Sequence, residues 1–101
     1  MSQYQFVQQA QQDLIQIRQF TLKEWGSKQS IVYLKELKKT VELLSTMPLM
    51  GKNCANDLGK DIYRFLYGNH AIYYLLMPHL IIIIAILHQS MVPENQLRSR
   101  I

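Results

Sequence analysis

DIYRFLYGNHAIYYLLMPHLIIIIAIL, from Asp61 to Leu87, is the stretch that decides the fold. Aromatic and β-branched residues dominate it, and Gly-Asn and Pro-His pairs interrupt it at short intervals, which is typical of consecutive strands joined by tight turns. The pattern predicts three strands, which cover residues 61–66, 70–76 and 80–87, with turns at Tyr67-Gly68-Asn69 and Met77-Pro78-His79. Pro78-His79 also argues against a membrane helix, which needs about 20 continuous apolar residues.

Upstream of these strands, the hydrophobic spacing changes to the helical period. Residues 3–7 predict a short first strand, and a helix follows from Gln8 with a buried face that includes Ala10, Leu14 and Ile17. Gly26 interrupts this helix, and Ser27 is predicted to cap a second helix over residues 28–45. The buried stripe of the second helix is predicted to contain Tyr33, Leu34, Leu37, Val41 and Leu44. The two helices should form an antiparallel hairpin that covers one face of the sheet.

The last strand, Leu80 to Leu87, is apolar at every position and therefore needs cover on both of its faces. The hairpin can cover only one face, which leaves the polar tail, residues 89–101, for the other. We expect this tail to leave part of the second face open, and an open apolar face on a monomer indicates a protein partner.

Length, charge and cysteine content narrow the class of protein. A chain of 101 residues forms one domain, here residues 1–101. Its formal net charge of +4 comes largely from lysines along one solvated helix face; it is compatible with an acidic partner but does not choose between protein and nucleic acid. The single cysteine, Cys54, cannot form an internal disulfide, and a surface or half-buried thiol is expected. The first residues show no signal-peptide pattern, so we expect a cytoplasmic protein.

Four groups of residues together resemble a known family. They are Ala10-x-x-Asp13-Leu14-x-x-Ile17-x-x-Phe20-Thr21-x-x-x-Trp25-Gly26-x-x-Gln29-x-x-x-Tyr33-Leu34-x-x-Leu37, Pro48-x-x-Gly51, Arg64-x-x-x-Gly68-x-His70-x-Ile72-x-Tyr74, and Ile86-Leu87-His88-x-x-Met91. In this order and spacing they resemble the ParE toxins of the ParE/RelE superfamily of type II toxin–antitoxin systems. The resemblance extends from about Tyr4 to Leu97.

The resemblance implies an α+β fold of order β-α-α-β-β-β, with the first strand beside the last. It also implies a toxin that inhibits DNA gyrase by contact, without a catalytic centre, cofactor or metal, and that a ParD-like antitoxin neutralises. Sequence-specific binding of nucleic acid by the toxin alone is not expected. This sequence departs from the family at Val92, where the ending usually carries an aspartate.

Two alternatives remain at this point. A RelE-type toxin cuts messenger RNA on the ribosome and needs an acid, a base and cations, for which Arg64 and His88 are the candidates. The second alternative is a toxin-fold protein that only binds an antitoxin. The three histidines show no spacing typical of a metal site. The predicted partner-binding residues are Arg64, His70, Tyr74, His88, Met91 and Leu97.

Overall fold

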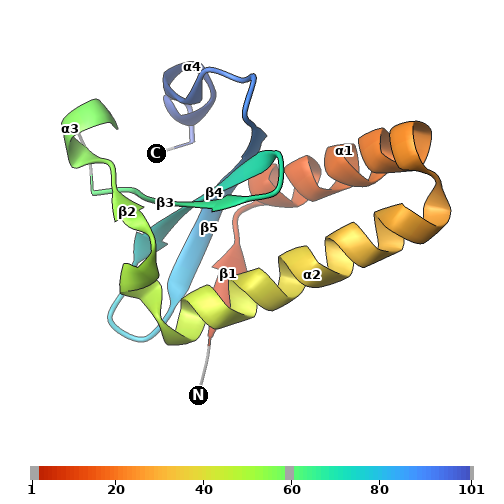
Figure 1. The fold of residues 1–101 in the computed structure, drawn as a ribbon. Coiled ribbons are helices and arrows are strands. Elements are labelled where there is room, and N and C mark those ends of the chain that lie inside the picture. Colours follow the sequence, from red (N-terminus) through yellow and green to blue (C-terminus); the bar gives the residue numbers. More distant parts are fainter. Residues whose placement is uncertain (1–2, 59–60, 101) are drawn as a thin grey trace.

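The computed structural model describes residues 3–58 and 61–100, apart from the side chain of Asp57. Gly59 and Lys60 of the predicted polar loop, and Ile101 of the predicted tail, lie outside the described residues. The elements are β1 (Tyr4–Phe6), α1 (Gln8–Trp25), α2 (Ser27–Thr46), the 3₁₀ turn η1 (Pro48–Met50), β2 (Lys52–Asn53), α3 (Ala55–Leu58), β3 (Tyr63–Tyr67), β4 (His70–Leu76), β5 (Ile81–His88) and α4 (Pro93–Leu97) (Figure 1). In this part of the chain, no helix is both long enough and apolar enough to cross a membrane.

The strands form one sheet in the order β1-β5-β4-β3-β2, in which β1 runs parallel to β5 and the other pairs are antiparallel. The predicted α+β class, the order of the elements and the placement of the first strand beside the last are confirmed. The apolar strand β5 lies between β1 and β4, as its composition requires. β2 and α3 were not predicted, because they are too short to leave a periodic pattern in the sequence.

The helix hairpin covers one face of the sheet, here called the helix face. Leu37, Val41 and Leu44 of α2 are buried with Ile17 of α1 in a cluster that includes Ile72 and Ile83 of the sheet. The predicted cap at Ser27 is wrong, because α2 begins at Ser27 and its N-cap is Gly26. Gly26 has φ 86° and ψ 170°, a conformation that is essentially restricted to glycine, so the sharp turn between the helices depends on this residue.

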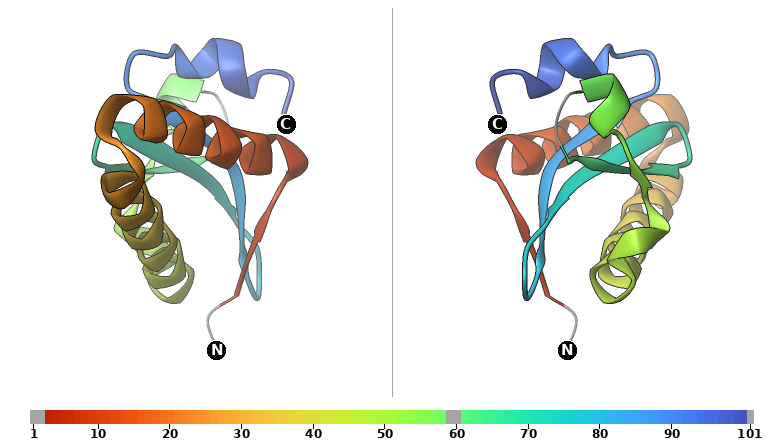
Figure 2. Two further views of the ribbon diagram at one scale, coloured as in Figure 1. Left: turned by 90° about the vertical axis from the view of Figure 1, so that its right-hand side faces the viewer. Right: turned by 90° about the vertical axis from the view of Figure 1, so that its left-hand side faces the viewer.

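The opposite face of the sheet, here called the tail face, is covered by the chain itself. Its buried residues are Ile62, Ala71, Tyr73, Ile84, Ala85, Leu87 and Leu97. Figure 2 shows α3 and α4 together above the sheet, away from α2. Leu97 of α4 packs into this face and closes much of it, but Leu66, the cross-strand partner of Ala71, is 68% exposed, so the expectation that the tail leaves part of the face open is confirmed there. Cys54 also proves to be buried, with 2% of its surface exposed, which corrects the predicted surface or half-buried thiol.

A bulge in β5 decides which residues lie on which face. Tyr73 pairs with Ala85 and Tyr74 with Ile83, so Ile84 is an extra residue in the ladder. Ile84 and Ala85 both face the tail side, and Ile86 returns to the helix face. His88 therefore shares the face of Ile86 but not that of Ile82 and Ile84, which a strict alternation along the strand would predict.

Candidate functional site

An apolar groove runs between the two helices, and we call it the hairpin groove. Figure 1 shows α1 and α2 diverging from their turn, with β1 lying at the wide end of the gap. The groove holds about 440 Å³ and is lined by Tyr4, Phe6, Leu14, Ile15, Arg18, Leu34, Leu37, Lys38 and Val41. Ile15 is 51% exposed, because it lies off the buried stripe of α1.

The charge of the hairpin groove has one sign. Arg18 and Lys38 are the charged residues among its lining, and no carboxylate lines it within the described residues. Apolar walls and a cationic rim suit an amphipathic segment that carries acidic side chains.

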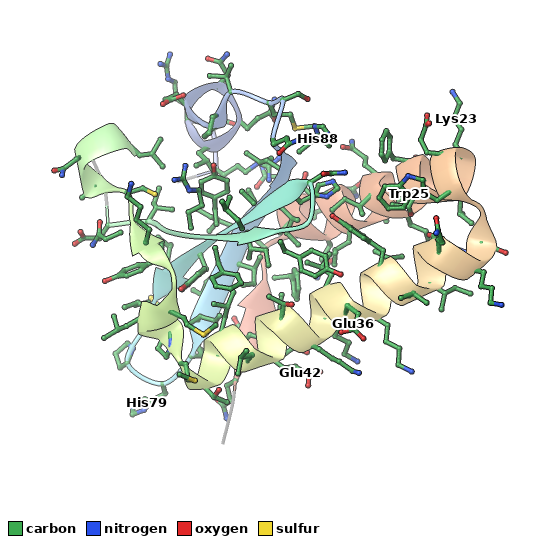
Figure 3. The ribbon with its side chains drawn as sticks, viewed as in Figure 1. Lys23, Trp25, Glu36, Glu42, His79 and His88 are labelled. Carbon is green, nitrogen blue, oxygen red and sulfur yellow. The ribbon has the colours of Figure 1, made fainter. Side chains whose placement is uncertain are left out.

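A second cavity, here called the histidine pocket, lies between α1 and the edge of the sheet where β4 begins and β5 ends. It holds about 340 Å³ and is lined by Asp13, Gln16, Ile17, Phe20, His70, Ile86, His88, Ser90 and Met91. His70 and His88 are cross-strand partners whose ring centroids are 5.4 Å apart, and Phe20 lies 6.0 Å from His88. Figure 3 labels His88 at the α1 end of the sheet, on the same side of the molecule as Trp25.

The two histidines differ in their electrostatics. The Nδ1 atom of His70 is hydrogen-bonded to the Tyr33 hydroxyl at 2.7 Å, and burial, with a smaller contribution from His88, lowers the pKa of His70 to about 4. His70 is therefore neutral near pH 7. The Nδ1 atom of His88 accepts the backbone N–H of Ser90 at 3.1 Å, so a neutral His88 carries its proton on Nε2.

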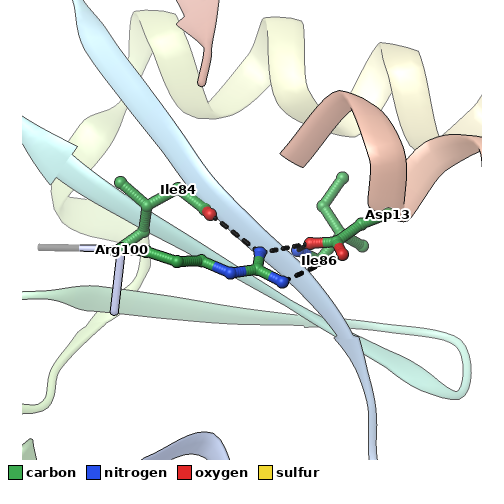
Figure 4. Close-up of polar contacts among 4 residues, drawn as sticks. All are labelled: Asp13, Ile84, Ile86 and Arg100. Carbon is green, nitrogen blue, oxygen red and sulfur yellow. Dashed lines mark hydrogen bonds and ion pairs between the residues drawn. The ribbon is translucent and has the colours of Figure 1, made fainter. Parts of the chain in front are cut away.

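A buried ion pair fastens the C-terminal segment beside this pocket. The Arg100 guanidinium donates to both carboxylate oxygens of Asp13, at 2.6 and 3.2 Å (Figure 4). Arg100 also donates to the carbonyl oxygen of Ile84 at 3.1 Å, and Asp13 accepts the N–H of Ile86 at 3.0 Å. We call these four contacts the clasp.

Arg64 lies far from the histidines, on the tail face. It lines a polar cavity of about 440 Å³ together with Cys54, Tyr73 and Glu94. Burial raises the pKa of the Tyr73 hydroxyl, and the nearby Arg64 acts against that rise. Arg64 and His88 are thus separated by the sheet, and the structure does not bring together the two residues that the ribonuclease alternative requires.

The six predicted partner-binding residues occupy three different environments. His70, His88 and Met91 meet in the histidine pocket, whereas Arg64 lies on the tail face. Tyr74 is fully buried, and its hydroxyl donates to the Pro48 carbonyl at 2.6 Å and accepts the Gly51 N–H at 3.1 Å. Leu97 is 2% exposed. Tyr74 and Leu97 therefore stabilise the fold and offer almost no surface to a partner.

Sequence reasoning missed the clasp and the hairpin groove. Asp13 carried a usable signal, because a carboxylate on the buried face of a helix needs a partner. Ile15 was a second signal, since it lies with Leu22 on an apolar stripe separate from the main face. No spacing in the sequence pointed to Arg100, which lies 87 residues from Asp13.

Comparison with known proteins adds sequence and structural relatives. The family model for the ParE toxin of the type II toxin–antitoxin system, parDE, matches residues 4–93. Toxin ParE1 of Caulobacter vibrioides is 33% identical over 91 residues, which cover 90% of this chain and 93% of that protein. A solved structure described as a chromosomal ParDE TA system from P. aeruginosa superposes with a TM-score of 0.72 at 13% identity and shares the fold, covering 87% of this chain and 96% of the other.

The family match spans all the strands and the helix hairpin, and the curated relative matches over nearly the same length. The chain belongs to the ParE toxin family of type II toxin–antitoxin systems.

Proposed function

We propose that this toxin arrests bacterial growth by binding DNA gyrase, that it does so in the cytoplasm without catalysing a reaction, and that a ParD-like antitoxin encoded beside it neutralises it. The observation that carries the non-catalytic part is the position of Arg64 and His88 on opposite faces of the sheet. Family membership supports the toxic role and the pairing with an antitoxin.

Cleavage of RNA through its 2′-hydroxyl needs a base, an acid and a cation around one phosphate. Here the phosphate could meet Arg64 or His88 but not both, because the buried residues of β4 and β5 separate them. His70, whose ring centroid lies 5.4 Å from that of His88, is buried and hydrogen-bonded to Tyr33. Inhibition by surface contact needs none of these groups to react.

The hairpin groove supports neutralisation by an antitoxin. Its apolar walls would be covered by an amphipathic segment, and acidic side chains on that segment would pair with Arg18 and Lys38. We therefore expect the neutralising segment of the antitoxin to be acidic and to carry apolar residues on one side.

The target is tested with purified toxin in two parallel reactions, one with gyrase and relaxed plasmid and one with translating ribosomes. We expect loss of supercoiling or trapped cleaved plasmid in the first reaction and intact messenger RNA in the second. His88→Gln should retain much of the inhibition, because it removes at most one surface contact, whereas loss of a catalytic acid or base would lower a rate by about 10²–10⁴-fold. Site-specific cleavage of message that disappears in His88→Gln would overturn the proposal, and no effect in either reaction or on growth would leave only antitoxin binding.

The groove is tested with two matched substitutions, Ile15→Glu and Ile31→Glu. Both residues are exposed apolar side chains on the hairpin, at 51% and 65%, but only Ile15 lines the groove. Ile15→Glu should weaken antitoxin binding by about tenfold or more, equivalent to about 1.4 kcal/mol, and Ile31→Glu should not. Equal effects of the two substitutions would show that the antitoxin does not use the groove.

A further inference from the structure

The clasp contacts the part of β5 that lies beyond its pairing with β1. β1 accompanies β5 only over Ile81, Ile82 and Ile83, and Val7 makes the last backbone bond, from its N–H to the Ile83 carbonyl at 3.1 Å. Beyond that point, the Ile84 carbonyl and the Ile86 N–H need other partners, because a buried backbone group without one is costly. Arg100 and Asp13 supply them.

The clasp joins three separate parts of the chain. Asp13 belongs to α1, Ile84 and Ile86 belong to β5, and Arg100 follows α4. The side chains of Arg100 and Asp13 are only 10% and 8% exposed. A bidentate arginine–carboxylate pair is directional, so it fixes the position of the C-terminal segment as well as holding it down.

The segment between β5 and α4, residues 89–92, is here called the rim loop. It is held at one end by β5 and at the other by α4, which Leu97 and Arg100 anchor. Within the loop, Gln89 donates its N–H to the Asn69 carbonyl at 2.9 Å, and Met91 donates its N–H to the His88 carbonyl at 2.9 Å. Met91 lines the histidine pocket, and Asp13 of the clasp lines the same pocket.

The rim of this pocket is apolar and accessible. Phe20 is 42% exposed and Met91 is 40% exposed, and Val92, which follows Met91 in the rim loop, is 52% exposed. Phe20 and Met91 line the pocket with His88, whereas the hairpin groove contains none of these residues. The rim loop and the hairpin groove are therefore separate apolar surfaces.

We propose that Asp13 and Arg100 are positioning residues for toxicity, because the clasp fixes the rim loop in the conformation in which Met91 and its neighbours contact the target. This inference rests on the proposed function, since it takes the target to be the gyrase that the toxin inhibits by contact. The antitoxin occupies the hairpin groove, so the clasp affects inhibition of the target without affecting antitoxin binding.

The test compares Arg100→Gln with Arg98→Gln in the full-length chain. Arg98 is an exposed arginine two residues away for which the described residues show no side-chain ion pair within 4 Å, so it controls for the loss of charge. Arg100→Lys can keep one donor to Asp13, and Asp13→Asn with Arg100→Gln removes both charges so that no unpaired buried charge remains. For each variant we would measure hydrogen exchange of residues 88–97, inhibition of purified gyrase, and affinity for the antitoxin.

In Arg100→Gln, we expect exchange in the rim loop to rise by about tenfold more than exchange of the amides of α2 and β4, whose exchange changes only through the loss of global stability. The toxin concentration for half-inhibition of gyrase should rise by about tenfold or more, and the antitoxin Kd should change by less than about twofold. Arg100→Lys should recover part of the inhibition, and Arg98→Gln should behave as the wild type. If Arg100→Gln proves too unstable to purify, the doubly substituted variant gives the same comparison.

Three results would overturn the inference. Unchanged exchange in residues 88–97 would show that the clasp does not position the loop, and faster loop exchange with full inhibition would show that the loop does not contact gyrase. Uniformly faster exchange with parallel loss of gyrase and antitoxin binding would assign the clasp to general stability. A wild-type toxin that does not inhibit gyrase would instead refute the proposed function, while the exchange data would still decide whether the clasp orders the loop.

Discussion

The two faces of the sheet are covered in different ways. On the helix face, two long amphipathic helices bury a continuous stripe that includes Ile17, Leu37 and Leu44. On the tail face, the cover consists of short helices, and the C-terminal segment is attached mainly through Leu97 and the clasp. The cover of the helix face is therefore held by many apolar contacts, whereas the C-terminal segment on the tail face is held by a few residues.

This difference has an energetic consequence. Distributed apolar contacts lose stability gradually, because each side chain contributes a similar share of the buried area. A segment held by one apolar anchor and one ion pair can detach locally without unfolding the domain. The buried polar contacts also differ. On the helix face, the neutral imidazole of His70 is hydrogen-bonded to Tyr33, whereas the C-terminal segment is held by the charged pair of Arg100 and Asp13.

Arg100→Ala is expected to give the largest loss of stability. It leaves the Asp13 carboxylate buried without its counter-charge, which typically lowers the free energy of unfolding by about 3–5 kcal/mol. Chemical denaturation followed by circular dichroism measures this loss. Asp13→Asn combined with Arg100→Ala should lose clearly less than Arg100→Ala alone, and an equal or larger loss would show that the unpaired charge is not the cause.

Leu37→Ala and Leu97→Ala compare the two faces directly. Both side chains are almost completely buried, at 1% and 2% exposure. Leu37→Ala should lower the free energy of unfolding by about 2–5 kcal/mol, because the surrounding helices cannot close the cavity. Leu97→Ala should cost less in global unfolding but should speed hydrogen exchange in residues 91–100 more, since α4 can detach alone. Equal global losses would show that the tail is as integral to the core as the hairpin.

Most of the helix face could be predicted from the sequence, because long elements repeat their pattern several times. The bounds of β4 were predicted without error at His70 and Leu76, and the stripe of α2 was identified through Leu37, Val41 and Leu44. The last strand was placed one residue too early at both ends. Its bulge at Ile84 could not be predicted, because no local residue pattern marks it.

The tail face could not be predicted for a different reason. A five-residue helix with one buried residue, Leu97, has no detectable period, so the tail was predicted to be a polar segment that covers the face only in part. Of the candidate site, the sequence identified His88 and Met91, which the structure brings together in one pocket. It could not join Asp13 to Arg100, because that contact depends on the folded path of nearly the whole chain.

The imidazole under the helices should make stability depend on pH. The pKa of His70 is lowered from 6.5 to about 4 in the folded protein, so the unfolded chain binds this proton more readily between those values. The contribution of His70 to the free energy of unfolding is therefore complete above about pH 6.5 and decreases as the pH falls, by up to about 3 kcal/mol at pH 4.

The measurement is denaturation of the wild type and His70→Asn between pH 4 and pH 7. Asn places an amide nitrogen near the position of Nδ1, which bonds Tyr33 in the wild type. The variant should lose the His70 part of the pH dependence, so the difference between the two curves isolates this residue from the carboxylates that also titrate. His88, which contacts His70, remains in both proteins. Parallel curves would show that His70 titrates normally.

The smallest effect is expected at the other ion pair of the described residues, Lys39 with Glu36. Its Nζ and Oε1 atoms are 3.4 Å apart, as in many salt bridges, but the side chains are 62% and 52% exposed. Solvent screens such a pair and its ordering costs side-chain entropy, so Lys39→Ala should change the free energy of unfolding by less than about 0.5 kcal/mol. Lys35→Ala, on the exposed side of the same helix, serves as the unpaired control and should give a similar value. If Lys39→Ala cost as much as Arg100→Ala, burial would not be what distinguishes the clasp, and the contrast between the two faces would lose its physical basis.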